Sequence, residues 1–143
     1  PALDWLLANG KAEGARMVMR VGMSVPSHCS LLKDAAVELA AALAAIPVAA
    51  PQFSVLHNLD AQPRSAPDAI RAALAAQLHQ PVQWTRTLQS LASQGVTHWL
   101  ECGPGKVLTG LVKRSVEGAQ LVALEDPAAL AAAALTLKPQ GNP

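Results

Sequence analysis

The sequence predicts an α/β fold in which helices cover a parallel sheet. Helix-like and strand-like segments alternate three times along the 143 residues, and only short turns separate them. Neighbouring parallel strands need a crossover between them, and a helix in each connection supplies it. Hydrophobic residues make up 51% of the chain and charged residues 15%, so we expect it to bury a core instead of staying disordered.

The first two elements are expected to form an appendage to this fold. Three leucines share one face of an opening helix that ends at Gly14, and residues 16–21 form a short run typical of a strand. Both elements precede the loop that carries His28. We therefore expect them to lie outside the main sheet.

Helix and strand signals then continue in alternation. A helix is predicted over 31–46, with Ser30 as its N-cap and Pro47 after its end, because its apolar residues follow the helical period. A buried strand is predicted over 53–57. Ser65 and Asp68 form a capping-box pattern that predicts the start of the next helix. The remaining expected elements are a helix from Trp84 to Gly95, a strand over 96–100, a helix over 106–116, a strand over 121–124 and a final helix that begins at Asp126 and Pro127.

Composition excludes several classes of protein. The net charge is only +1 and the basic residues are not interleaved with aromatic ones, so we expect no nucleic-acid partner. No segment reaches the ~18 uninterrupted apolar residues of a membrane span, and the first residues lack the charged region and apolar core of a signal peptide. Two cysteines are too few for a disulfide framework and fit a reducing cytoplasm. The four histidines and the cysteines lack metal-ligand spacing, so no metal site is predicted.

His28 is the candidate catalytic residue. It lies in the run Val25-Pro26-Ser27-His28-Cys29, where a strand-like segment meets a helix-like one. A neutral imidazole suits proton transfer near pH 7, and ligands of α/β sheets bind beside the carboxyl ends of strands. The alternative interpretation is a histidine at a helix start that only satisfies a backbone carbonyl.

Three further features have two interpretations each. The turn Gly103-Pro104-Gly105-Lys106 precedes a predicted helix and could bind an anion, but it lacks P-loop spacing, and a tight strand-to-helix turn is favoured. Asn58 either orients active-site loops or is a turn residue at a strand end. Ser27 either borders a binding site or makes a local turn or cap.

Four stretches carry a more specific signal: SVPSHC over 24–29, VLHNLD over 55–60, QLHQPVQW over 77–84 and ECGPGKVLTGL over 101–111. In this order they resemble segments of the malonyl-CoA:acyl-carrier-protein transacylases of bacterial fatty-acid synthesis. The resemblance implies an α/β-hydrolase-like acyltransferase core with a small ferredoxin-like insert. It assigns residues 1–22 to the last helix and strand of that insert, 23–137 to the C-terminal part of the large domain, and 138–143 to a tail.

The resemblance also implies a reaction and its residues. A serine in a Gly-x-Ser-x-Gly turn attacks malonyl-CoA, His28 takes the serine proton, and the main-chain carbonyl of Gln77 orients the imidazole in place of a triad carboxylate. Ser27 is expected to border the acyl pocket, and Asn58 joins it as a candidate substrate-binding residue. The implied partners are malonyl-CoA and acyl carrier protein, with no cofactor besides the coenzyme A thioester that is the substrate.

One part of the family pattern is missing from the chain. No Gly-x-Ser-x-Gly sequence occurs in it, so we expect the chain to supply the histidine base but not the nucleophile. It is then a C-terminal portion that is incomplete without the N-terminal half of the same enzyme. Two alternatives stay open: an acyltransferase of polyketide synthesis with the same chemistry, and a non-catalytic α/β binding module.

Overall fold

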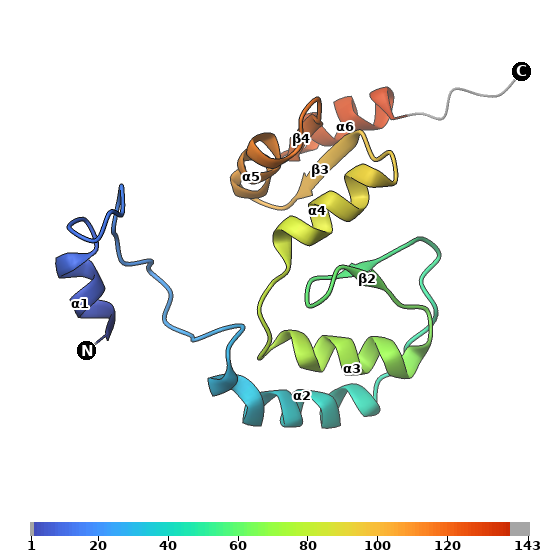
Figure 1. The fold of residues 1–143 in the computed structure, drawn as a ribbon. Helices are drawn as coiled ribbons and strands as arrows, with labels where there is room; N and C mark the ends of the chain where they lie inside the picture. Colours follow the sequence, from blue (N-terminus) through green and yellow to red (C-terminus); the bar gives the residue numbers. More distant parts are fainter. Residues whose placement is uncertain (1, 138–143) are drawn as a thin grey trace, which may run out of the picture.

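The computed structural model describes residues 2–137, and the predicted tail over 138–143 lies outside this range. Figure 1 shows an N-terminal helix set apart, a helix pair with a small hairpin above it, and a C-terminal α/β unit. The elements in chain order are α1 (Ala2–Asn9), η1 (Ser30–Leu32), α2 (Lys33–Ala44), β1 (Leu56–His57), β2 (Gln62–Pro63), α3 (Pro67–Gln77), α4 (Trp84–Ser93), β3 (His98–Cys102), α5 (Val107–Ser115), β4 (Gln120–Leu124) and α6 (Pro127–Thr136).

The C-terminal unit has the predicted α/β arrangement. Strands β3 and β4 are parallel and in register from His98 opposite Gln120 to Cys102 opposite Leu124, with α5 as the crossover between them. Helices α4, α5 and α6 each bury one apolar residue, and these residues are Leu88, Val112 and Ala133. The α/β class is therefore confirmed, on a sheet that contains two strands among the described residues.

Helices α2 and α3 pack side by side and run antiparallel (Figure 1). Small side chains line the groove between them, since Ala36 and Ala40 of α2 lie there with Ala75 and Ala76 of α3, and both Ala36 and Ala75 are buried. Alanine favours helix formation and lets two helix axes approach closely. The pair positions both His28 and Gln77, the two residues of the candidate site. His28 lies shortly before α2, and Gln77 is the last residue of α3.

Two strand predictions were wrong in detail. Residues 16–21 contain no strand, and the strand predicted over 53–57 is reduced to Leu56–His57, which pairs antiparallel with Gln62–Pro63. The physical reason is that a strand exists only where a neighbour completes its hydrogen bonds. Residues 17–24 instead run as an extended segment without ladder partners in the described chain. Its apolar side chains are mostly uncovered, because Met17, Met19 and Val21 are strongly exposed and only Val18 of residues 16–22 is partly buried.

Two of the three predicted helix caps were also wrong. Ser30 lies inside the short helix η1, and the N-cap position of α2 is Leu32, without a side-chain hydrogen bond. The cap of α3 is Ala66, and Asp68 pairs with Arg71 instead of closing a capping box. Asp126 does begin α6, because its carboxylate accepts a hydrogen bond of 2.8 Å from the N–H of Ala129.

No helix among residues 2–137 is both long and apolar enough to cross a membrane.

Candidate functional site

His28 lies in the turn that joins the extended segment to η1, and its backbone is in an unusual conformation. Its φ of 61° falls in the left-handed region, which residues other than glycine rarely adopt. Such a conformation costs about 1–3 kcal/mol and persists only where surrounding contacts hold it. Here the contacts come from the carboxyl end of α3. The His28 N–H donates to the Leu78 carbonyl at 3.0 Å, and Nδ1 lies 2.8 Å from the Gln77 carbonyl oxygen.

The Gln77 contact defines which ring nitrogen of His28 carries the proton. A carbonyl oxygen can only accept a hydrogen bond, so Nδ1 is the donor and Nε2 of the neutral ring keeps a free lone pair. The carbonyls of Gln77 and Leu78 belong to the last turn of α3, where helix carbonyls lack intrahelical partners. This end of a helix also carries partial negative charge, which favours a nearby cation. The arrangement therefore suits an imidazole that gains and loses a proton at Nε2.

Ser27 precedes this histidine in a tight turn. Its N–H donates to the Val25 carbonyl at 2.8 Å, and the Cys29 thiol donates to the Pro26 carbonyl at 3.1 Å. These two local bonds fix the chain on either side of His28. All three residues from 27 to 29 are partly exposed, so the turn is accessible from solvent.

Asn58 lies in the turn between β1 and β2. A hydrogen bond joins this turn to the loop over 78–83, which follows α3. The main-chain oxygen of Asn58 accepts a hydrogen bond of 2.6 Å from the N–H of Gln83, while Leu78, at the start of that loop, holds His28. The side-chain oxygen Oδ1 of Asn58 is buried and has no hydrogen-bond partner among residues 2–137. The loop over 78–83 therefore contacts His28 at its first residue and Asn58, with its buried Oδ1, at its last.

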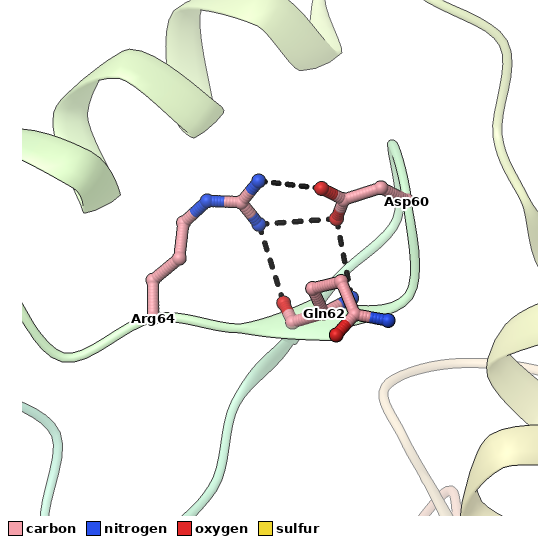
Figure 2. Close-up of polar contacts among 3 residues, drawn as sticks. All are labelled: Asp60, Gln62 and Arg64. Atoms are coloured by element: carbon pink, nitrogen blue, oxygen red, sulfur yellow. Dashed lines mark hydrogen bonds and ion pairs between the residues drawn. The ribbon is translucent and has the colours of Figure 1, made fainter.

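An ion pair stiffens the hairpin that carries Asn58 (Figure 2). Arg64 donates to both carboxylate oxygens of Asp60, at 2.6 and 3.1 Å, and to the Gln62 carbonyl at 3.2 Å. Asp60 also accepts from the Gln62 N–H at 3.1 Å. The hydrogen bond from Arg64 is the main reason that the pKa of Asp60 lies below its ordinary value of 3.8. Sequence reasoning missed this pair, because an acidic and a basic residue four positions apart are expected to meet on a helix and not across a hairpin turn.

The turn Gly103-Pro104-Gly105-Lys106 does not offer a free anion site. The Glu101 carboxylate already accepts hydrogen bonds from the N–H groups of Leu108 and Thr109, at 3.0 and 2.7 Å. Lys106 is paired with Glu125 at 2.8 Å, which raises the pKa of the lysine above its ordinary 10.5. The favoured interpretation as a strand-to-helix turn agrees with this geometry, since an internal carboxylate occupies the N-terminus of α5.

A cavity of about 240 Å³ lies between α4, β3 and α5, and no pattern in the sequence indicated it. Trp84 and Trp99 both line it, and their indole N–H groups are buried without a partner among the described residues. Buried tryptophan usually finds an acceptor for its N–H.

No group of three or more potential metal-ligating side chains occurs within residues 2–137.

Solved structures that superimpose on this chain include acyl-carrier-protein malonyltransferases. A malonyl-transacylase solved with the acyl-carrier protein of a type II polyketide synthase superimposes with a TM-score of 0.88 at 43% identity, over 94% of this chain and 44% of that chain. The transacylase of Xanthomonas oryzae gives a TM-score of 0.85 at 46% identity, over 92% of this chain and 42% of that chain.

Curated relatives carry the name malonyl CoA-acyl carrier protein transacylase. The Escherichia coli K12 protein is 50% identical over 123 residues, which is 86% of this chain and 40% of the relative. A Staphylococcus aureus relative is 35% identical over 127 residues, covering 87% of this chain and 41% of the relative. A scan against models of known protein families finds no match.

These matches confirm the resemblance to malonyl-CoA:acyl-carrier-protein transacylases, with the chain corresponding to their C-terminal portion. The chain spans about two fifths of the length of the relatives it matches, since it covers 40% of the Escherichia coli protein.

Proposed function

We propose that this chain is the base-bearing portion of a malonyl-CoA:acyl-carrier-protein transacylase. In this proposal the enzyme moves a malonyl group from coenzyme A to the phosphopantetheine thiol of acyl carrier protein, through an acyl-serine. The nucleophilic serine belongs to the N-terminal half of the same enzyme, because no Gly-x-Ser-x-Gly sequence occurs in this chain. The observation that carries the proposal is the hydrogen bond between His28 Nδ1 and the Gln77 carbonyl, in a chain that resembles these enzymes.

The proposed reaction uses Nε2 of His28 in both half-reactions. Nε2 first accepts the proton of the serine hydroxyl as the serine oxygen attacks the thioester carbonyl, and it then gives this proton to the departing coenzyme A thiolate. In the second half it accepts the proton of the carrier-protein thiol as that sulfur attacks the acyl-serine. The proton returns to the serine oxygen when the acyl-enzyme bond breaks. No redox step or metal is needed for this sequence.

The Gln77 carbonyl takes the orienting role that a carboxylate has in a triad. It holds the tautomer with the proton on Nδ1, which leaves Nε2 as the base. It supplies a dipole and no full negative charge, so part of the stabilisation of the imidazolium comes from the carbonyl end of α3. Ser27 and Asn58 are proposed to border the substrate, Ser27 beside the base and Asn58 through its buried Oδ1.

We further propose the domain division given by the resemblance. Residues 1–22 then form the C-terminal end of a ferredoxin-like subdomain, and residues 23–137 belong to the large acyltransferase domain. The strong exposure of Met17, Met19 and Val21 supports this, because large apolar side chains on a segment without neighbours are covered when the rest of such a subdomain packs against them. We place the reaction in the cytoplasm, with malonyl-CoA, acyl carrier protein and the N-terminal half as partners.

The test is His28→Ala in the full-length enzyme, meaning a polypeptide in which this chain follows a nucleophile-bearing N-terminal portion. We expect malonyl transfer to carrier protein to fall by roughly 10²- to 10⁴-fold, the usual worth of a general base. The control is His98→Ala, since His98 begins β3 at the end opposite to the strand's carboxyl end. Near wild-type transfer by His28→Ala would contradict the mechanism and favour the interpretation of a histidine that only satisfies a carbonyl.

A second candidate function is malonyl loading for polyketide synthesis. It is favoured by the TM-score of 0.88 to a malonyl-transacylase bound to the carrier protein of a type II polyketide synthase. The chemistry at His28 is the same in both cases, so the two functions differ in the carrier. Parallel transfer assays with a fatty-acid carrier protein and a polyketide carrier protein separate them, and the preferred carrier has the higher kcat/KM.

A further inference from the structure

Arg71 of α3 reaches across to the carboxyl end of α2. Its Nε donates to the Leu43 carbonyl at 3.0 Å, and its Nη2 donates to the Ile46 carbonyl at 2.8 Å. The third contact, from Nη1 to Asp68, stays within α3 at 2.8 Å. The Arg71 side chain is 23% exposed, whereas that of Asp68 is 99% exposed. The bond to Leu43 is partly buried, whereas the bonds to Ile46 and Asp68 are exposed.

The chemistry of this contact suits a fixed geometry. Leu43 lies in the last turn of α2, where carbonyls carry partial negative charge, and its oxygen also accepts from the Ile46 N–H at 3.1 Å, while Ile46 lies just beyond the end of the helix. A guanidinium presents its donors in one rigid plane, so it can meet two carbonyl oxygens only in a narrow range of positions. Arg71 thus joins α2 to α3 in a defined axial relationship.

The rest of the helix interface defines that relationship weakly. The groove between the two helices is lined by Ala36 and Ala40 of α2 and by Ala72, Ala75 and Ala76 of α3, and methyl groups form shallow ridges and grooves. Such a surface permits close approach, but it offers little resistance to a shift of one helix along the other. The axial register of α2 against α3 therefore depends on the polar contacts of Arg71 at one end of the pair and of His28 at the other.

At the other end of the pair lies His28. Its Nδ1 and its N–H are bound by the last turn of α3, through Gln77 and Leu78, while its own chain continues directly into η1 and α2. One residue of helix rises about 1.5 Å, and a hydrogen bond of this kind is lost beyond about 3.2 Å. Because the Nδ1 to oxygen distance is 2.8 Å, a shift of a single residue along α3 would break the contact.

We propose that Arg71 is a positioning residue for the His28 base. By fixing the register of α2 against α3 at one end, it keeps the Gln77 carbonyl within reach of Nδ1 at the other. This inference deepens the proposed function and rests on it. Arg71 itself does not touch the substrate in this proposal and acts only through the helix pair.

The experiment compares Arg71→Met, Arg71→Lys and Asp68→Ala in the full-length enzyme. Methionine keeps an apolar stem and removes every donor, while lysine keeps the charge without the planar fork. We expect kcat to fall by about 10- to 100-fold in Arg71→Met with KM little changed, since a misplacement of about 1 Å can cost ~10²-fold. Arg71→Lys should retain an intermediate kcat. Asp68→Ala is the matched control and should keep kcat, because both cross-helix bonds survive.

The second readout follows the hydrogen bond itself. In protein labelled with ¹⁵N-histidine, the Nδ1 proton of His28 should give a downfield NMR signal that His28→Ala removes. We expect this signal to shift or broaden in Arg71→Met and to stay in place in Asp68→Ala. A purely structural role for Arg71 would lower the melting temperature and leave both the signal and kcat unchanged in the folded variant.

The outcomes separate the inference from the function on which it rests. Loss of transfer in His28→Ala together with wild-type kcat and Nδ1 signal in Arg71→Met would overturn the role of Arg71 alone. Full activity of His28→Ala would overturn the proposed function, and the NMR signal would still report whether Arg71 positions the ring. If Arg71→Met does not fold, Arg71→Lys decides: reduced kcat with a shifted signal supports the inference, and wild-type values overturn it.

Discussion

The carboxylate of Glu101, near the end of β3, accepts hydrogen bonds from both the N–H and the hydroxyl of Thr109, each 2.7 Å long. Thr109 lies in the first turn of α5, so this one side chain fastens the strand to the helix that follows it. Together with the N–H of Leu108, these donors satisfy the start of the helix and lower the pKa of Glu101 below its ordinary value of 4.5. The main-chain bond from Thr109 is the largest contribution.

The pH dependence of α5 follows from this contact. Because the carboxylate is favoured in the folded protein, its stabilising effect is present above the ordinary pKa of 4.5 and is lost as pH falls through the lower folded value. We expect the amides of the first turn of α5 to exchange hydrogen faster, relative to the intrinsic rate, as pH drops from 5 towards 3. In Glu101→Gln the same amides should be weakly protected against hydrogen exchange over this whole pH range, with little pH dependence. Glu117→Gln, a change at an exposed position, is the control, and an unchanged profile in Glu101→Gln would contradict the role of the carboxylate.

Gln77→Ala should have a mild effect on transfer. The group that contacts His28 is the main-chain oxygen of residue 77, which every amino acid supplies, and alanine fits the last turn of a helix. We expect kcat/KM in the full-length enzyme to stay within about threefold of wild type, as a change of less than 1 kcal/mol implies. A collapse of the rate comparable to that of His28→Ala would mean that the glutamine side chain takes part.

Asn58→Ala tests whether the buried Oδ1 finds a donor in the full-length enzyme. If it accepts a hydrogen bond from the substrate or from the N-terminal portion, its loss should lower kcat/KM about five- to tenfold, the equivalent of ~1 kcal/mol. Steady-state transfer assays measure this change. The opposite outcome is unchanged kcat/KM with a higher melting temperature, because removal of a buried acceptor that lacks a donor relieves its desolvation cost.

Asp126→Ala should destabilise α6. The carboxylate caps this helix through the N–H of Ala129 at 2.8 Å, and loss of such a cap costs about 1 kcal/mol. We expect the amides of the first turn of α6 to lose up to about tenfold of their protection against hydrogen exchange, while transfer activity stays near wild type. Asp34→Ala is a suitable comparison, because Asp34 lies in the first turn of α2 and is not its N-cap. If the first turn of α6 is equally protected against hydrogen exchange in Asp126→Ala and Asp34→Ala, Asp126 does not stabilise the start of α6.

The sequence by itself determined the local elements of this protein. The helices over 67–77 and 84–93, the two strands of the parallel pair and the cap at Asp126 all follow from spacing within one element, where neighbours a few positions apart decide the outcome. The four motifs also indicated the transacylase resemblance from short runs of residues alone. The boundaries differ from the predicted ones by one or two residues at α2 and α5, where helix ends depend on what surrounds them.

Only the tertiary structure decided which of these elements meet. The strand signal at 16–21 found no neighbour in the described chain, while the short run at Gln62–Pro63, which carries no such signal, became the partner of β1. Arg71 closes the end of α2 from another helix, a contact over 28 residues to Leu43 that no local cap rule anticipates. The contact between His28 and Gln77 spans 49 residues and exists because α2 and α3 pack antiparallel. Periodicity is a property of neighbouring residues, whereas pairing and site geometry depend on packing between segments that are distant in the chain.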